Sequence, residues 1–522
     1  MPPTPVTPSD FTNEPLTDFT RDENRRKMEE ALAQVRSQLG KRYQLIIGGE
    51  RYSTPEYFSS IDPARKGEVV GYFCKATAQH AEQAMQAALK TFEAWRDVPA
   101  EKRADLLFKS ATIMRRRKHD LAAWMVFEVG KSWVEADADV AEAIDFCEFY
   151  GREMLRLAGE QPLTRIAGER SELVYIPLGV GVIVPPWNFP LAILCGMTAA
   201  AIVTGNTVVL KPSSDAPTTG YKFMEVLEEA GLPPGVVNFV TGPGGAIGDH
   251  LVQHPKTRFV AFTGSKAVGI GISEKAGKVM PGQIWIKRAI LEMGGKDAIL
   301  VADDANLDAA VDGVAAAAFG FQGQKCSACS RAIVDEKIYE PFLEKLVART
   351  RAIAVGSPAD PKTAVGPVIN ERAFRSIMEY IEVGRTEGRV VAGGEPGPAD
   401  GFFVMPTVIA DVEPKARLAQ EEIFGPVLAV IKCRGFEDGL RIANDTEYGL
   451  TGAVYTGSAT RIAEARRLFH VGNLYVNRKC TGAMVGAHPF GGFNMSGTDS
   501  KAGGRDYLLL FTQAKAIAEK TA

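Results

Sequence analysis

The sequence predicts an α/β protein of two domains, and three observations lead to this fold class. The chain has 522 residues, more than one hydrophobic core usually organises at about 150 residues per domain. Short β-branched runs separated by helical segments recur at roughly 20- to 30-residue intervals, the spacing of parallel βαβ units. This pattern occurs twice, first after residue 173 and again from about residue 298, so two α/β series follow each other along the chain.

The individual elements follow from local patterns. Residues 1–40 are polar and predict an N-terminal arm with a charged helix from about residue 21. Apolar residues at helical spacing across 77–157 predict a helical layer. The low-polarity run 189–203 is shorter than the roughly 20 residues that a bilayer requires and predicts a buried helix. Two hairpin-like polar segments, 155–177 and 497–516, fit neither strand series. The predicted strands are 181–184, 207–210, 236–240, 258–262, a strand near 298, 331–334, 404–409 and 427–431.

Charge and cysteine content exclude several classes of protein. With 60 Lys and Arg against 63 Asp and Glu, the formal net charge is −3, so no global field attracts nucleic acid or an anionic membrane. The seven cysteines are too few and too scattered for a disulfide framework, which indicates a reducing compartment. Acidic residues occur early in the chain, with no apolar stretch behind a basic start, which argues against a leader peptide. We therefore expect a cytoplasmic protein.

The parallel strands suggest a nucleotide site, although the G-x-G-x-x-G fingerprint of dinucleotide-binding folds is absent. Glycines 242, 244 and 245 follow one predicted strand, and Gly264-Ser265 follows another. Both places offer small residues and free N–H groups where a pyrophosphate could approach. Each place taken alone is more typical of a plain turn. The Gly264 segment lacks the Lys-Ser/Thr end of a P-loop, which excludes a kinase or ATPase.

Three short motifs carry the chemistry. Pro-Pro-Trp-Asn-Phe-Pro (185–190) ends a predicted strand, Leu-Glu-Met-Gly-Gly-Lys (291–296) precedes another, and Gly-Gln-Lys-Cys (323–326) places its cysteine 34 residues after Glu292. Together they resemble the aldehyde dehydrogenase superfamily. Further matches in the family's order are Lys211-Pro212, Phe262 to Ser265, Glu421 to Pro426 and Pro489 to Gly492.

The resemblance gives each motif residue a role in aldehyde oxidation. An aldehyde releases hydride only after a nucleophile has made its carbon tetrahedral, and a thiolate does this well near neutral pH. Cys326 is the implied nucleophile. The Asn188 amide and the Cys326 N–H are the implied oxyanion donors, each worth about 3 kcal/mol. Glu292 is the implied base that activates water to hydrolyse the resulting thioester.

Each of these residues also has a plainer interpretation. Taken singly, Cys326 is typical of a buried structural thiol, Asn188 of a helix cap and Glu292 of a surface carboxylate. Cys326 and Cys329 form a C-x-x-C pair, which suggests a metal or redox site, but no second pair and no nearby His accompany it. The joint presence of all three motifs at family spacing favours catalysis, and we expect no metal.

The resemblance also implies NAD as cofactor and assigns residues to it. Many NAD-preferring relatives have Glu three residues after the lysine, where the carboxylate repels a 2′-phosphate. This chain has Ser214 there, so NADP stays open. The implied cofactor-binding residues are Trp187, Lys211, Ser214, Gly245, Ser265, Glu422 and Phe424.

The segments 319–331 and 477–500 resemble one family within the superfamily, the Δ1-pyrroline-5-carboxylate (L-glutamate γ-semialdehyde) dehydrogenases. Their substrate carries an α-carboxylate several bonds from the aldehyde, so the pocket needs anion donors away from Cys326. The alternative for several of these positions is a solvated loop. The implied substrate-binding residues are Lys325, Ser327, Gly482 and Ala483 for the carboxylate, Phe189 and Phe490 for the aliphatic stem, and Glu142 for the α-ammonium.

We therefore expect a Rossmann-like NAD-binding domain (41–154 and 178–290), an α/β catalytic domain (291–496) and a small oligomerisation flap (155–177 and 497–516) behind an N-terminal arm (1–40). The expected reaction is the second oxidation of proline breakdown, in a homo-oligomer that works with a separate proline dehydrogenase. Two alternatives stay open. One is a dehydrogenase for another aldehyde, such as succinate semialdehyde, and the other is a catalytically silent binding protein with the same fold.

Overall fold

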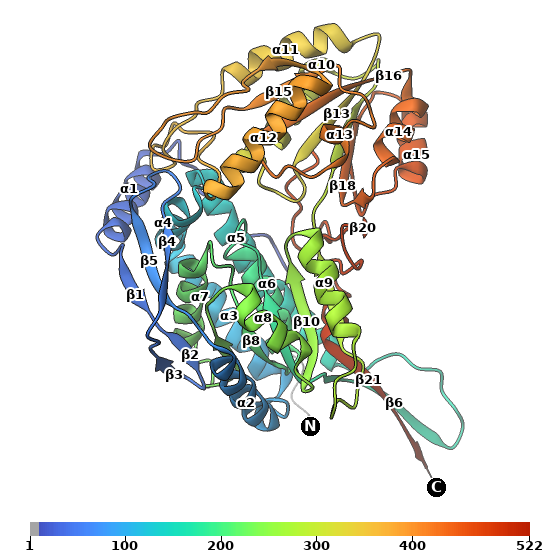
Figure 1. Ribbon diagram of the computed structural model, residues 1–522. Coiled ribbons are helices and arrows are strands. Elements are labelled where there is room, and N and C mark those ends of the chain that lie inside the picture. Colours follow the sequence, from blue (N-terminus) through green and yellow to red (C-terminus); the bar gives the residue numbers. More distant parts are fainter. Residues whose placement is uncertain (1–9, 522) are drawn as a thin grey trace.

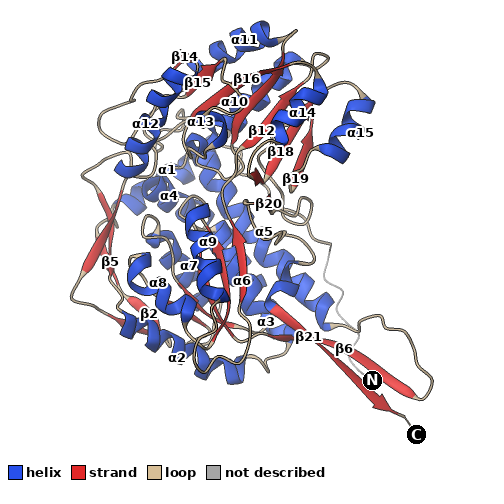
Figure 2. Ribbon diagram, turned by 45° about the vertical axis from the view of Figure 1, so that its right-hand side comes forward, coloured by secondary structure: helices blue, strands red, loops and turns tan. Residues whose placement is uncertain are grey.

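The computed structural model describes residues 10–521, so residues 1–9 of the predicted N-terminal arm, and residue 522, lie outside the described part. Two seven-stranded sheets, each flanked by helices, stand one above the other (Figure 1). A two-stranded arm projects from the lower part of the molecule (Figure 2). The α/β fold class with two sheet-containing units is confirmed.

The first sheet has the order β11-β10-β7-β8-β9-β2-β3 and is parallel from β11 to β9. Its central strands β7 and β8 are rich in valine and are buried along almost their whole length, as expected where helices cover both faces. The strand positions predicted for this series are confirmed. The strands are β2 (Leu45–Ile47), β3 (Glu50–Tyr52), β7 (Val180–Val184), β8 (Thr207–Leu210), β9 (Val237–Phe239), β10 (Thr257–Thr263) and β11 (Arg288–Glu292).

Helices surround this sheet, and the apolar run predicted as a buried helix forms α6 at its centre. Every residue of α6 except Ile193 is buried, because its neighbours α5 and β7 leave no face to solvent. None of the described helices combines the length and the apolar character needed to cross a membrane. The helices are α1 (Asp22–Arg36), α2 (Ala78–Trp95), α3 (Ala100–Arg116), α4 (Lys118–Val129), α5 (Trp133–Ala158), α6 (Ala192–Val203), α7 (Pro217–Glu229), α8 (Gly244–Gln253) and α9 (Lys266–Gly277).

The second sheet has the order β14-β15-β16-β13-β12-β18-β19, with only the edge strand β14 antiparallel. The predicted second strand series falls on β12, β13, β15 and β16. Its strands are β12 (Asp297–Val301), β13 (Cys329–Asp335), β14 (Arg389–Ala392), β15 (Thr407–Ala410), β16 (Val427–Cys433), β18 (Thr451–Tyr455) and β19 (Asn473–Val476). Its helices are α10 (Leu307–Phe319), α11 (Tyr339–Arg351), α12 (Glu371–Glu387), α13 (Arg417–Gln420), α14 (Phe436–Asn444) and α15 (Ala459–Leu468).

The projecting arm pairs β6 (Glu169–Pro177) with β21 (Thr512–Lys520) over nine antiparallel positions. The second strand therefore runs past residue 516, whereas the chain before it closes against the core through η2 (Tyr507–Phe511), in which Leu508 and Phe511 are buried. A separate small sheet has the order β1-β5-β4, and β17 pairs with β20. These strands are β1 (Lys41–Tyr43), β4 (Tyr57–Ile61), β5 (Val69–Cys74), β17 (Tyr448–Gly449) and β20 (Phe493–Asn494).

The topology brings the motifs together. Strands β7, β8 and β10 are parallel neighbours or next neighbours, so the loops at their carboxyl ends lie along one edge of the sheet. These loops begin at Pro185, Lys211 and Gly264, and β11 ends beside them at Glu292. The second sheet contributes the loop of Cys326, which leads into β13.

Candidate active site

The loop that carries Cys326 has an unusual backbone. After α10 the chain forms a short turn, η1 (Gly320–Gly323), in which Phe321 and Gln322 adopt φ values of +48° and +59°. The Gln322 side chain holds this turn by donating to the carbonyl oxygens of Gly130 (3.0 Å) and Pro367 (2.8 Å). Left-handed backbone at non-glycine residues persists only where surrounding contacts determine it, and this buried amide supplies them.

The second glutamine of the motif connects the nucleophile loop to Asn188. The side-chain oxygen of Gln324 accepts a hydrogen bond from the N–H of Ile369 at 2.9 Å, and its backbone carbonyl accepts one from Nδ2 of Asn188 at 3.0 Å. Asn188 is buried. Because an amide nitrogen carries two hydrogens, one of them has no acceptor among residues 10–521, and Asn188 lines the same cavity as Cys326.

The Cys326 thiol is buried among carboxyl groups that disfavour its ionisation. Burial raises its pKa well above the ordinary value, and the charges of Asp297, Glu292 and Glu422 raise it further. The N–H of Ser327 opposes this shift by stabilising the thiolate. Asp297 is itself buried, and burial raises the pKa of its carboxyl well above the usual range.

Glu292 has the environment of a general base. Burial raises its pKa to about 8, against the opposing hydrogen bonds of the Ser500 hydroxyl and the Gly492 N–H. A base with a pKa near the working pH transfers protons most effectively. Its Oε2 is buried and has no hydrogen-bond partner among residues 10–521, so one carboxylate oxygen keeps unused acceptor capacity.

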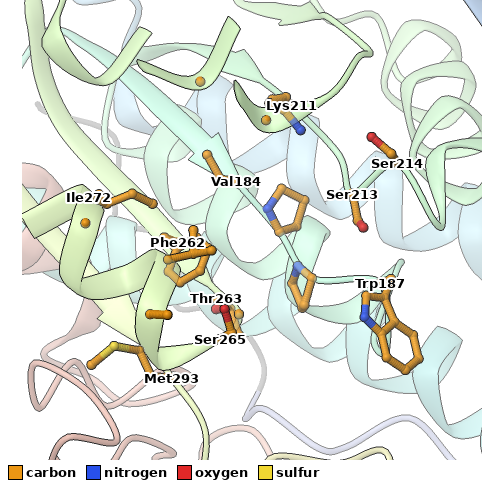
Figure 3. A pocket seen from close by; sticks show the side chains of 18 of the residues that line it. Val184, Trp187, Lys211, Ser213, Ser214, Phe262, Thr263, Ser265, Ile272 and Met293 are labelled. Carbon is orange, nitrogen blue, oxygen red and sulfur yellow. The ribbon is translucent and has the colours of Figure 1, made fainter. Parts of the chain in front are cut away.

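A cavity of about 890 Å³ lies between the strand ends and Cys326. All seven predicted cofactor residues line it, together with Asn188 and Cys326. Figure 3 shows Lys211, Ser213 and Ser214 on one side of this cavity, and Thr263 and Ser265 in another part of its wall. The sequence motifs, which are scattered over 240 residues of the chain, thus share one cavity.

The polar groups of the cavity suit a dinucleotide. Lys211 is 5% exposed, and within the described residues its ammonium donates only to the neighbouring Pro212 carbonyl, at 3.2 Å. Burial lowers its pKa to about 8. The Ser214 hydroxyl donates to the Gly242 carbonyl at 3.2 Å. Glu422 accepts from the Gly295 N–H at 3.1 Å, and burial raises its pKa to about 7.

Two helices begin at this cavity. Helix α8 starts at Gly244, and Gly245 follows with open space where a Cβ would stand. Helix α9 starts after Ser265. The unpaired N–H groups at helix N-termini attract anions, so both ends suit a pyrophosphate. Trp187 and Phe424 form an edge-on pair with ring centroids 5.6 Å apart, and Phe424 adopts a left-handed φ of +56°.

The residues predicted to bind the substrate carboxylate lie outside this cavity. The thiol of Cys480 donates to the Ser327 carbonyl at 3.3 Å, which brings Gly482 and Ala483 close to Ser327. Among residues 10–521, no acceptor receives the N–H of Gly482 or of Ala483. Two adjacent free N–H groups form an anion-binding concavity.

The two charged residues predicted to contact the substrate, Lys325 and Glu142, each interact with neighbouring groups of the protein. The Lys325 ammonium lies 2.7 Å from both carboxylate oxygens of Glu135, so its charge is balanced inside the protein. Burial and the neighbouring Asp139 raise the pKa of Glu142 to about 8, so that its carboxyl needs a bound cation to be ionised at neutral pH. Substrate contacts of Lys325 and Glu142 stay predictions.

The two predicted aromatic contacts lie near the catalytic residues. The Phe189 ring lies 4.1 Å from the buried ammonium of Lys131, measured to the ring centroid. Phe490 is half-buried and donates its N–H to the Ala502 carbonyl at 2.8 Å. The following residue, Gly491, is so close to Glu292 that a Cβ there would lie 2.9 Å from Oε1.

Comparison with known proteins agrees with this geometry. The profile of the aldehyde dehydrogenase family matches residues 51–517. The chain belongs to the aldehyde dehydrogenase family.

Several relatives of this aldehyde dehydrogenase are named 1-pyrroline-5-carboxylate dehydrogenase. The chain is 57% identical over 509 residues to a 1-pyrroline-5-carboxylate dehydrogenase of Geobacillus thermodenitrificans, covering 98% of this chain and 99% of that one. It is similar to the crystal structure of 1-pyrroline-5-carboxylate dehydrogenase from Thermus with bound NAD, with a TM-score of 0.97, 51% identity and coverage of 99% and 100%. It also resembles proline utilization A from Bdellovibrio bacteriovorus, with a TM-score of 0.97 and 45% identity, covering 99% of this chain and 54% of that protein.

Several residues that shape the site of this aldehyde dehydrogenase were missed from the sequence. Ser500 and Gly492 hold Glu292, Gln322 and Gln324 hold the nucleophile loop, and Asp297 stands beside Cys326. The two glutamines and Asp297 lie in or next to quoted motifs, so their position was a usable signal. Gly492 and Ser500 lie in the quoted segments 489–492 and 477–500, but nothing local in those segments indicated a contact with Glu292, which only the folded chain makes. Among the described residues, no group of three His, Cys, Asp or Glu side chains is arranged to hold a metal ion.

Proposed function

We propose that this enzyme oxidises L-glutamate γ-semialdehyde, formed when Δ1-pyrroline-5-carboxylate opens, to L-glutamate with NAD+, as the second oxidation of proline breakdown. The observation that carries the proposal is the convergence of Cys326, Asn188 and Glu292 beside a dinucleotide-sized cavity, in a chain 57% identical to a 1-pyrroline-5-carboxylate dehydrogenase.

The cavity residues support NAD+ as cofactor. Lys211 and Glu422 would hold ribose hydroxyls, and the starts of α8 and α9, at Gly245 and Ser265, would hold the pyrophosphate. Trp187 would lie near the pyrophosphate and Phe424 against the nicotinamide end. When bound, NAD+ supplies the hydride acceptor of the reaction. The Thermus structure with bound NAD, 51% identical to this chain, supports the same choice.

The protein groups divide the chemistry into two stages. In the first, the Cys326 thiolate attacks the aldehyde carbon, and the free amide hydrogen of Asn188 with the Cys326 N–H stabilises the oxyanion. Loss of hydride from the tetrahedral adduct leaves a thioester on Cys326. In the second, Glu292 takes a proton from water, which attacks the thioester and releases the carboxylate product. Its free Oε2 supports this role.

The substrate carboxylate would bind at the loops that carry Ser327 and the Gly482-Ala483 pair. The N–H groups of Gly482 and Ala483 and the hydroxyl of Ser327 are neutral donors, and three neutral donors suffice for a carboxylate in a partly buried site. Phe189 and Phe490 would enclose the aliphatic stem, and Glu142 would take the α-ammonium, which would itself favour the ionised carboxyl. Ser214 in place of a glutamate supports residual use of NADP.

Features outside the active site support proposals for the oligomeric state and the cellular compartment. The β6–β21 arm stands away from the core, which supports its role in a homo-oligomer, as part of a flap formed from 155–177 and 497–516 between domains bounded as predicted. Seven free thiols support a reducing, cytoplasmic compartment. The similarity to part of proline utilization A supports functional coupling with a separate proline dehydrogenase.

The deciding experiment is an NADH absorbance assay with pyrroline-5-carboxylate, succinate semialdehyde and hexanal, run with NAD+ and with NADP+. We expect the highest kcat/KM for pyrroline-5-carboxylate with NAD+. A preference for succinate semialdehyde would favour the alternative substrate, and no NADH with any aldehyde would favour a silent binding protein.

A further inference from the structure

The segment before α1 lies against the loop proposed to bind the substrate carboxylate. Asn13 stands between this loop and helix α5. Its side-chain nitrogen donates to Oδ2 of Asp145, on α5, at 2.8 Å and to the carbonyl oxygen of Val485 at 3.0 Å. Because a primary amide has two hydrogens, both are engaged, one toward the helix and one toward the loop.

Neighbouring residues hold Asn13 in this position. The N–H of Glu14 donates to Oδ1 of Asp145 at 2.6 Å, so the carboxylate accepts from two consecutive residues. The Phe11 ring packs edge-on against Phe149 of α5, with ring centroids 5.3 Å apart. It also lies against the loop at Gly486, where a Cβ would come within 3.1 Å of the ring and where φ is +79°.

Other contacts also support the loop between residues 481 and 488: Val485 is buried in the core, and the Met484 carbonyl accepts from the N–H groups of Ala487 and His488 at 3.1 and 2.8 Å. The Arg478 guanidinium donates to the carbonyl oxygens of Thr481 and Gly482, each at 3.0 Å, and the Gly486 N–H donates to the Gly503 carbonyl at 2.8 Å. Val485 lies between these anchors. The contact from Asn13 therefore holds the Val485–Gly486 peptide, two residues beyond Ala483, on the loop that carries the free N–H groups of Gly482 and Ala483.

We propose that Asn13 is a positioning residue for substrate recognition. By tying the Val485 carbonyl to Asp145 of α5, it fixes the peptide planes that present the N–H groups of Gly482 and Ala483 to the α-carboxylate. A donor pair binds an anion well only when its geometry is held by supporting contacts, and small displacements reduce that binding. The inference rests on the proposed function, because only a substrate with a carboxylate senses these groups.

The test compares substrates with and without that carboxylate. In Asn13→Ala we expect KM for L-glutamate γ-semialdehyde to rise roughly tenfold, the loss of about one hydrogen bond's worth of binding. Competitive inhibition by L-glutamate weakens in the same proportion, whereas KM for hexanal and kcat for both aldehydes change less than about twofold. Asn13→Asp keeps the shape but cannot donate and faces the Asp145 carboxylate, so it gives the same pattern.

Thr17→Val is the matched control on the same segment. Thr17 donates from its N–H (2.8 Å) and its hydroxyl to Asp137 of α5 without touching the 481–488 loop. We expect its KM values and L-glutamate inhibition to match those of the unmodified enzyme. Melting temperatures of all variants report whether the fold is intact.

Three results would overturn the inference. One is an unchanged KM and unchanged L-glutamate inhibition in a folded Asn13→Ala or Asn13→Asp enzyme. Another is an equal rise in KM for hexanal, which indicates a general disturbance. The third is failure of both variants to fold, which makes Asn13 a structural residue. Failure of the proposed function is distinguishable, because the unmodified enzyme would then show no preference for the semialdehyde over hexanal.

Discussion

The hydroxyl of Ser500 donates a hydrogen bond to Oε1 of Glu292, across a sequence separation of 208 residues. The chain before Ser500 is joined to the end of β11: the Met293 N–H donates to the Ser496 carbonyl at 2.8 Å, and the Thr498 N–H donates to the Leu291 carbonyl at 3.0 Å. Ser500 is 3% exposed. One oxygen of the candidate base is thus held by the protein, and the other stays available.

Ser500→Ala should move the pH dependence of turnover. The Ser500 hydrogen bond is the largest influence that lowers the pKa of Glu292, which stands at about 8. Removing it raises that pKa, and because a general base acts in its ionised form, the rising limb of kcat against pH moves to higher pH. At pH 7 we expect a roughly fivefold slower kcat. The control variant Thr498→Ala alters the same segment without touching the carboxylate and should keep the original pH profile. If the pH profiles of Ser500→Ala and the unmodified enzyme were superimposable, the prediction would be wrong.

Glu292→Gln should separate the two stages of the reaction. Acylation of Cys326 needs no water, so one NADH per site forms in a burst, whereas thioester hydrolysis slows about 10²- to 10⁴-fold without its base. Mass spectrometry of the rapidly quenched variant should find the acyl group on Cys326 and not on Cys329. Absence of both burst and adduct would count against the thioester route.

Ser327→Ala should affect aldehydes selectively. Loss of one neutral donor to the α-carboxylate raises KM for L-glutamate γ-semialdehyde by about three- to tenfold, with little change for hexanal. The Ser327 backbone carbonyl keeps its hydrogen bond from Cys480, so the loop stays in place. Equal effects on both aldehydes would argue that Ser327 does not contact the carboxylate.

Ser214→Glu should sharpen the choice of coenzyme. Ser214 lines the cofactor cavity, and a carboxylate there accepts from a ribose hydroxyl and repels a 2′-phosphate. We expect the ratio of kcat/KM with NAD+ to that with NADP+ to rise at least about tenfold. Ser213→Glu, one residue earlier in the same wall, tests whether position matters. A ratio that stays constant in Ser214→Glu would place the ribose elsewhere.

Lys131→Met should destabilise the protein. The Lys131 ammonium is fully buried and lies 2.5 Å from Oδ2 of Asp139, whose other oxygen accepts from the first N–H of α6, that of Ala192, at 2.6 Å. Removing one member of a buried pair leaves an uncompensated charge, at a cost of about 3–5 kcal/mol. Guanidinium unfolding measures the shift. Lys27→Met breaks the exposed pair with Glu23 and should leave the midpoint nearly unchanged; similar midpoints for both variants would refute the prediction.

Much of the fold, and the residues proposed to react, could be predicted from the sequence because they depend on local patterns. Valine-rich runs became β7 and β8, and the apolar run after Phe189 became α6, since each pattern buries its own apolar side chains. The motifs of Cys326, Glu292 and Asn188 identified the family. Ion pairs between residues far apart in the sequence could not be predicted in this way. From the sequence Lys325 was expected to be a free cation, but in the structure it forms an ion pair with Glu135.

The sequence by itself determined the two α/β series and the family, and it predicted the groups that we propose to react. Only the tertiary structure decided how those groups are held: Ser500 on Glu292, Gln324 on Asn188, and Asn13 on the loop at Val485, a residue 472 positions away. The physical reason is that a hydrogen bond acts over about 3 Å of space and leaves no periodic trace in the chain. Its partners become neighbours only when burial of the helices and sheets brings distant segments together.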